Sequence, residues 1–152
     1  MKKFNIKKIL VPTDFSEISA QAFAYAEDIA RQFGAEIHLV HVLEKDPPIP
    51  LIRTFDMTTE SVVKKLEEDT RSLLNQFRNK FSNDIQVKEV LLKGNDFEEI
   101  VEYSNNNDID LIVIATHGRT GLLHTLLGSV AEKVIRYAKK PVLVITATKE
   151  EN

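Results

Sequence analysis

Short apolar segments alternate along this chain with longer segments in which apolar residues recur about every 3.6 positions. The short segments are rich in valine, isoleucine and leucine, and they predict strands at residues 8–13, 36–43, 86–92, 110–115 and 141–145. The longer segments predict helices at residues 17–33, 58–81, 97–104 and 130–138. Such alternation favours right-handed crossovers and a mostly parallel sheet with helices on both faces. We therefore predict one α/β domain of three layers over residues 1–152.

Composition narrows the class of protein. The 152 residues are 43% hydrophobic, which suits one compact domain. No cysteine is present, so thiolate nucleophiles, disulfides and cysteine-based zinc sites are excluded, and a reducing compartment such as the cytoplasm is expected. The first apolar run stops at Pro12, too early for a signal peptide, and no segment is long enough to span a membrane. With a net charge of −3, the chain is not expected to bind nucleic acid.

Ligands of parallel α/β sheets bind beyond the carboxyl ends of the strands, where the strand order reverses. The segment after the fourth predicted strand holds three of the five glycines, at 118, 121 and 128. Glycine lets backbone N–H groups approach an anion, and a helix N-terminus adds unpaired donors, so Gly128 and Ser129 are candidate phosphate ligands. The alternative is a surface loop whose glycines make turns and whose Ser129 caps the helix.

Several catalytic and cofactor motifs are absent. The sequence contains no GxxxxGK[ST] phosphate loop, no GxGxxG after the first strand and no GxSxG nucleophile elbow. His38 and His41 lie three apart on a predicted strand and should face opposite sides of the sheet. His117 and His124 have no HExxH spacing. We therefore assign no catalytic residue.

The glycine-rich segment carries a specific resemblance. Ala115-x-x-Gly118, nine residues and then Gly128-Ser129 is similar to the G-x-x-G-(nine residues)-G-[ST] pattern of ATP-binding universal stress proteins. The segments ILVPTDFS at 9–16, HV at 41–42 and KPVLVI at 140–145 also resemble that family, so the likeness covers nearly the whole chain. Ala115 departs from the pattern, because its methyl group stands where the family has its first glycine.

The resemblance implies a five-stranded parallel sheet in the order 3-2-1-4-5 and a site for ATP with Mg²⁺ at its switch point. Asp14 would contact the ribose or the metal-linked phosphates, and Arg119 either pairs with a terminal phosphate or is a solvated loop residue. Asp14 alone is equally typical of a turn. The remaining residues carried over from the family pattern are Pro12, Thr13 and Val42 for adenine, Ile114 and Ala115 for the nucleoside, and Gly118, Gly128, Ser129 and Val130 for phosphates.

Two apolar segments indicate contacts. The last predicted strand, residues 141–145, would lie at a sheet edge, and the resemblance implies that two copies pair there as a homodimer. Four leucines at 121–127 either cover the nucleotide or anchor the loop.

The resemblance as a whole implies a dimeric, nucleotide-loaded regulatory or stress-response module, in which slow hydrolysis of ATP is an open alternative to simple binding. The alternatives are a phosphoryl or nucleotidyl transferase that uses the same cleft, and an interaction module that has lost ATP.

Overall fold

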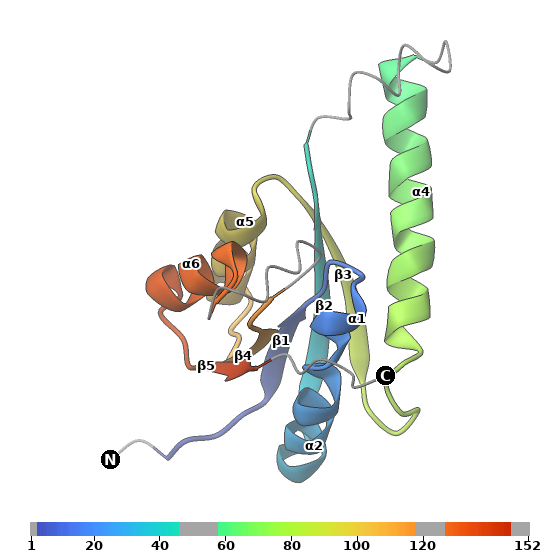
Figure 1. Ribbon diagram of the computed structural model, residues 1–152. Coiled ribbons are helices and arrows are strands. Elements are labelled where there is room, and N and C mark those ends of the chain that lie inside the picture. The colour runs from blue at the N-terminus through green and yellow to red at the C-terminus, as the bar shows by residue number, and fades with distance from the viewer. Residues whose placement is uncertain (1–2, 46–57, 118–126, 147–152) are drawn as a thin grey trace, which may run out of the picture.

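The computed structural model describes residues 3–45, 58–117 and 127–146, and contains one five-stranded parallel sheet (Figure 1). Its strand order is β3-β2-β1-β4-β5, which confirms the predicted order and fold class. The strands are β1 Lys8–Pro12, β2 Glu36–Leu43, β3 Val87–Lys93, β4 Leu111–Ala115 and β5 Val142–Ile145. The order reverses between β1 and β4, so the loops that follow these two strands leave the sheet at its switch point.

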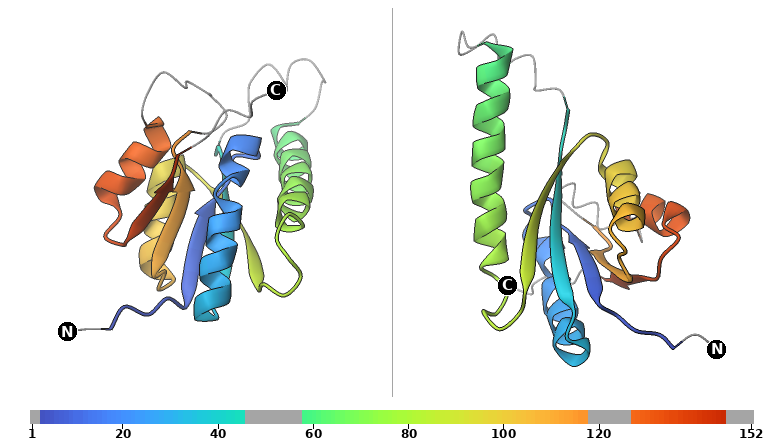
Figure 2. Two further views of the ribbon diagram at one scale, coloured as in Figure 1. Left: turned by 60° about the horizontal axis from the view of Figure 1, so that its bottom comes forward. Right: turned by 180° about the vertical axis from the view of Figure 1, so that it is seen from behind.

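Helices cover both faces of the sheet (Figure 2). One face carries α1 Glu17–Ala20, α2 Phe23–Phe33 and α4 Thr59–Arg78, and the other carries α5 Asp96–Asn106 and α6 Ser129–Tyr137. Alternation along β1 assigns Ile9 and Val11 to the core layer with α2 and α4, and Leu10 to the layer with α5 and α6. No helix among the described residues is long and apolar enough to cross a membrane.

The first predicted helix, residues 17–33, is divided in the structure. The N–H groups of Gln21 and Ala22 bond three residues back, to the carbonyls of Ile18 and Ser19, so the first helix ends in a tight turn and α2 begins at Phe23. The predicted stop at Gly34 is confirmed, since this glycine caps α2 with φ of 66°.

The second predicted helix, residues 58–81, ends earlier than expected, at Arg78. Lys80 and Phe81 bond three residues back through their N–H groups, which tightens the chain into a turn. The turn places the Phe81 ring in the core, stacked on Phe23 with the ring centroids 4.6 Å apart. The apolar side chain therefore reflects a buried turn rather than another helical residue.

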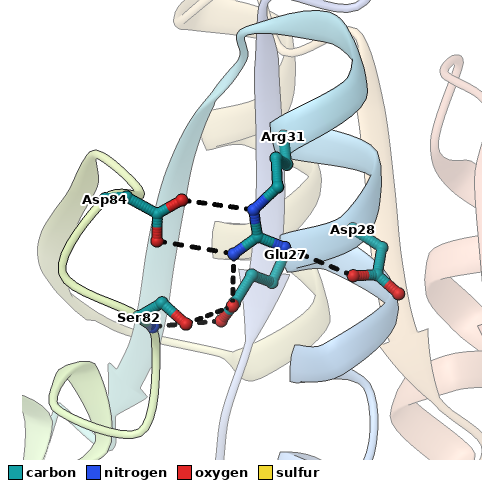
Figure 3. Close-up of polar contacts among 5 residues, drawn as sticks. All are labelled: Glu27, Asp28, Arg31, Ser82 and Asp84. Carbon is teal, nitrogen blue, oxygen red and sulfur yellow. Dashed lines mark hydrogen bonds and ion pairs between the residues drawn. The ribbon is translucent and has the colours of Figure 1, made fainter.

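A polar network ties the end of α2 to the connection between α4 and β3 (Figure 3). The Arg31 guanidinium donates to Asp84 at 3.2 Å and to Glu27 at 2.9 Å. Glu27 also accepts from the backbone N–H of Ser82 at 3.1 Å and from the Ser82 hydroxyl. These bonds, the Ser82 hydroxyl first among them, lower the pKa of Glu27 below its ordinary value of 4.5.

The lowered pKa of Glu27 makes this contribution to stability depend on pH. It is present above the ordinary pKa of Glu27 and is lost as the pH falls through the lowered value. Ser82→Ala should therefore lower the free energy of unfolding by about 1 kcal/mol at pH 7, and by less as the pH falls below 4. Urea unfolding of both proteins across this pH range measures the effect. In a Glu27→Gln background the pH dependence of the Ser82→Ala effect should vanish, and its persistence there would contradict this assignment.

Candidate functional site

A cleft of about 950 Å³ opens at the carboxyl ends of the strands, where β1 and β4 lie side by side. Its size is that of a small-molecule or cofactor site. The structure brings nine of the predicted site residues together in its lining, namely Pro12, Thr13, Asp14, Val42, Ile114, Ala115, Gly128, Ser129 and Val130. The two others, Gly118 and Arg119, lie outside the described residues, as does most of the leucine-containing segment at 121–127.

Asp14 begins the turn between β1 and α1 and also lines the cleft. Its Oδ1 accepts the backbone N–H of Ser16 at 3.0 Å and the Ser16 hydroxyl, which is the turn-forming role weighed above. Ser16 in turn caps α1 by accepting the N–H of Ser19 at 3.0 Å. A local structural role and a place in the cleft are therefore combined in one carboxylate.

Phe15, the next residue, has a left-handed backbone, with φ of 65°. This conformation is rare for a bulky side chain, and such residues cluster at functional sites. The Phe15 N–H donates to the Thr13 hydroxyl at 3.1 Å, and the Phe15 ring lines the cleft. Sequence patterns did not identify Phe15, because nothing in an aromatic residue after an aspartate signals a positive φ.

Gly128 joins the start of α6 to the end of β4. Its N–H donates to the Thr116 carbonyl at 2.5 Å, and it is the N-cap of α6. A Cβ at this position would lie 2.7 Å from the same carbonyl oxygen, although φ is an ordinary −71°. The glycine is required by close approach to the strand end, not by a left-handed backbone.

Ser129 is the first residue of α6 and is exposed in the cleft. The interpretation of Ser129 as the helix cap is wrong, because Gly128 is the N-cap and no side-chain cap bond is made there. The first N–H groups of a helix have no partner within it, so α6 directs backbone donors and the positive end of its dipole to the cleft. This arrangement suits an anionic group.

Ala115 ends β4 and is 6% exposed. Among the non-glycine residues that the structure describes, only Phe15 and Asp108 have positive φ, so the backbone at Ala115 does not need glycine. The alanine methyl group is therefore accommodated without strain where the family pattern has its first glycine.

His38 and His41 face opposite sides of the sheet, as their spacing predicts. His38 faces α5, where its Nδ1 lies 2.8 Å from the Tyr103 hydroxyl, and burial lowers its pKa. His41 faces the opposite side and stacks on Phe15 with ring centroids 4.2 Å apart. His117 is buried and lines the cleft. No group of three or more histidine, aspartate or glutamate side chains among the described residues could hold a metal ion.

Solved structures similar to this chain include two nucleotide complexes. A universal stress protein in complex with cAMP is 20% identical, with a TM-score of 0.68, and covers 95% of this chain and 99% of its own. A universal stress protein from Archaeoglobus fulgidus in complex with dAMP is 22% identical, with a TM-score of 0.61, over 94% and 99%. At these identities the likeness shows the shared fold.

Closer relatives extend over nearly the whole chain. Universal stress protein MJ0531 of Methanocaldococcus jannaschii is 37% identical, over 95% of this chain and 85% of its own length. The solved structure of MJ0577, a universal stress protein of the same organism, has a TM-score of 0.80 and 31% identity, over 95% of this chain and 99% of its own. The model of the universal stress protein family matches residues 5–146. The chain belongs to the universal stress protein family.

Proposed function

We propose that this protein binds an adenine nucleotide, ATP together with Mg²⁺, in the cleft between the β1 and β4 loops, and acts as a nucleotide-loaded regulatory module in the stress response. The observation that carries the proposal is the close approach of Gly128 to Thr116, which sets the N-terminus of α6 against the end of β4. The first residues of α6 and Asp14 line the same cleft at the switch point, which supports a site for an anionic group between them. The cAMP and dAMP complexes of similar structures support an adenine nucleotide as the ligand.

Different lining residues would contact different parts of the nucleotide. The N–H groups of Ser129 and Val130 and the Ser129 hydroxyl would hold phosphate oxygens. The family pattern assigns Gly118 and Arg119, which lie outside the described residues, to the same phosphates. Pro12, Thr13 and Val42 would hold the adenine through their backbone. Ile114 and Ala115, both buried, would line the nucleoside.

Mg²⁺ would be held mainly by the nucleotide. This ion prefers one or two carboxylates combined with phosphate oxygens over a cage made of protein groups alone. Asp14 supplies such a carboxylate at the rim of the cleft. The site fits a metal that arrives with its nucleotide, and the ion would neutralise phosphate charge beside Asp14. The absence of cysteine is compatible with a cytoplasmic setting.

The direct test is to purify the protein under mild conditions, denature it, and identify any released nucleotide by chromatography. Calorimetric titration of Mg²⁺-ATP, AMP and cAMP into the emptied protein gives the order of affinities. ATP in the released fraction, or tightest binding of Mg²⁺-ATP, supports the proposal. A protein that carries no nucleotide and binds none of the three would overturn it in favour of an interaction module without nucleotide.

The Asp14→Asn variant distinguishes a protein that binds ATP from one that converts it to a product. Asp14→Asn keeps an oxygen that can accept from Ser16 but removes the charge that faces Mg²⁺. For a module that holds ATP, we expect this variant to bind Mg²⁺-ATP more weakly. A variant that keeps its affinity but loses a measurable product would favour the transferase alternative instead.

The two edges of the sheet differ in a way that supports a homodimer through β5. At one edge β3 exposes charged side chains, of which Lys93 pairs with Glu67 of α4. At the other edge β5 has the sequence VLVI. A charged edge resists pairing with another chain, whereas an apolar edge invites it. We therefore infer that two copies pair through the segment from Pro141 to Ile145.

Proline scanning of β5 tests this pairing. The N–H groups of Ile112 and Thr116 bond to the carbonyls of Pro141 and Ile145, so these odd-numbered residues of β5 face β4 and Val144 presents its N–H to the open edge. Val144→Pro should give a monomer, because it removes the edge donor and leaves the bonds to β4.

Val144→Ala is the matched control, since it also shortens the side chain but keeps the N–H group. Sedimentation or light scattering gives the oligomeric state of both variants. A native protein that is monomeric, or a Val144→Pro variant that stays dimeric, would contradict pairing through β5.

A further inference from the structure

We propose that His41 is a positioning residue that holds the loop between β1 and α1, residues 13–16, in the conformation that presents Asp14 to the cleft. The inference deepens the proposed nucleotide site and rests on it. The first contact is between His41 Nδ1 and the Thr13 carbonyl oxygen, at 2.7 Å. A carbonyl oxygen can only accept, so Nδ1 is the donor and carries the proton. Thr13 is 5% exposed, and its carbonyl would be costly to leave unpaired.

The second contact is between rings. The imidazole of His41 stacks on Phe15 at a centroid distance of 4.2 Å and an interplanar angle of 26°. Phe77 of α4 meets the same Phe15 ring edge-on, at 5.3 Å and 67°. Aromatic pairs in these geometries are stabilising beyond the area they bury. A left-handed backbone is strained for an L-residue with a Cβ, and the two ring contacts offset this strain at Phe15.

The two contacts lie on either side of Asp14. His41 holds the carbonyl of the residue before it and the ring of the residue after it. Within the loop, the Phe15 N–H donates to the Thr13 hydroxyl at 3.1 Å and the Ser16 N–H donates to Asp14 at 3.0 Å. The left-handed turn at Phe15 thus brings Ser16 back to the carboxylate. His41, on β2 between β3 and β1, thereby fixes the orientation of the Asp14 side chain through contacts with the two residues that flank it.

Histidine combines a ring N–H donor with an aromatic face, which asparagine and phenylalanine offer only singly. Asparagine can place an amide donor near the position of Nδ1 but has no ring. Phenylalanine can keep the stack but has no donor. These two substitutions separate the hydrogen bond from the ring contact, and His41→Ala removes both.

The experiment measures two quantities for each of the three variants. Calorimetry gives the Kd for Mg²⁺-ATP, and hydrogen exchange without nucleotide gives the opening of the amides of Phe15 and Ser16. We expect His41→Ala to weaken binding about a hundredfold and the two single-function variants about tenfold each, where tenfold corresponds to 1.4 kcal/mol. Exchange at both amides should accelerate in the same order.

A control variant separates positioning from general stability. Phe81→Leu disturbs the same core layer, through the ring stacked on Phe23, at a residue outside the loop and outside the cleft lining. It should lower Tm but leave the Kd for Mg²⁺-ATP unchanged. If His41 acted only through the stability of the fold, its variants would behave like Phe81→Leu, with a lower Tm and an unchanged Kd for Mg²⁺-ATP. That result would contradict the proposal.

The remaining outcomes are also decisive. Native exchange rates at Phe15 and Ser16 in His41→Ala would overturn the proposal whether or not nucleotide binds. A loosened loop that binds Mg²⁺-ATP with native affinity would overturn it as well. If the native protein binds no nucleotide, the proposed function fails. Amide exchange that is fastest in His41→Ala and slower in His41→Asn would then still support a positioning role of His41 in the loop.

Discussion

Replacing Gly128 by valine is expected to weaken nucleotide binding at least about a hundredfold and to destabilise the fold by roughly 1–3 kcal/mol. The added Cβ would lie 2.7 Å from the Thr116 carbonyl oxygen, a backbone atom that cannot turn aside. The first turn of α6 must therefore move away from the end of β4. Such a movement breaks the bond between the Gly128 N–H and Thr116, and it displaces the donors proposed to hold phosphate.

Calorimetry with Mg²⁺-ATP and thermal unfolding measure both effects. Gly34→Ala is the matched control, because Gly34 caps α2 with φ of 66° and has open space around its Cβ position. Its alanine variant should lose about 1 kcal/mol of stability through backbone strain but no affinity. A Gly128→Val variant that unfolds at the native Tm and binds nucleotide normally would show that this close approach is dispensable.

Gly128 is expected to affect both binding and stability, and the sequence predicts only the effect on binding. The concentration of glycines singled out the segment around Gly128, and the expected reason was approach of the backbone to a phosphate, which stays a prediction. The structure adds a second reason, which is approach of the backbone to Thr116. A sequence shows that a residue has no side chain but not which neighbour occupies the space, since that neighbour comes from a strand end a dozen residues earlier.

The strands could be predicted well, because buried parallel strands are short apolar runs that the helical period does not explain. Their order could not be derived from periodicity and came from the resemblance, which the structure confirms. The helix boundaries failed where tight turns follow helical segments, at Gln21 and after Arg78. Alanine-rich and amphipathic patterns continue through such turns, because buried turn residues are apolar for the same reason as buried helical ones.

The α4 side of the cleft had no sequence signal at all. Leu66, Thr70 and Leu73 line it, although they look like ordinary positions of an amphipathic helix. Phe15 and His41 also required the fold, since their stacking joins two segments that the sequence places far apart. Motifs locate the residues that repeat across a family, whereas the residues that hold those motifs in place are found from contacts.

Replacing Ser129 by proline is expected to weaken binding of Mg²⁺-ATP about tenfold or more while leaving Tm unchanged or slightly raised. Ser129 is the first residue of α6, where proline is well tolerated because its missing N–H has no partner in the helix and its fixed φ suits the first turn. The preceding residue, Gly128, is extended with ψ of 158°, which is the conformation that a following proline favours. The substitution therefore removes one proposed phosphate donor without disturbing the helix.

Ser129→Ala is the control, because it removes the hydroxyl and keeps the N–H group. A hydrogen bond to a charged group contributes about 1.5–3 kcal/mol, so the proline variant should bind Mg²⁺-ATP at least about tenfold more weakly than the alanine variant. Calorimetry of the two variants at equal salt isolates the backbone donor from the side chain. Equal affinities at equal Tm would mean that the Ser129 N–H does not hold a phosphate oxygen, and the proposed set of phosphate donors would be wrong at this residue.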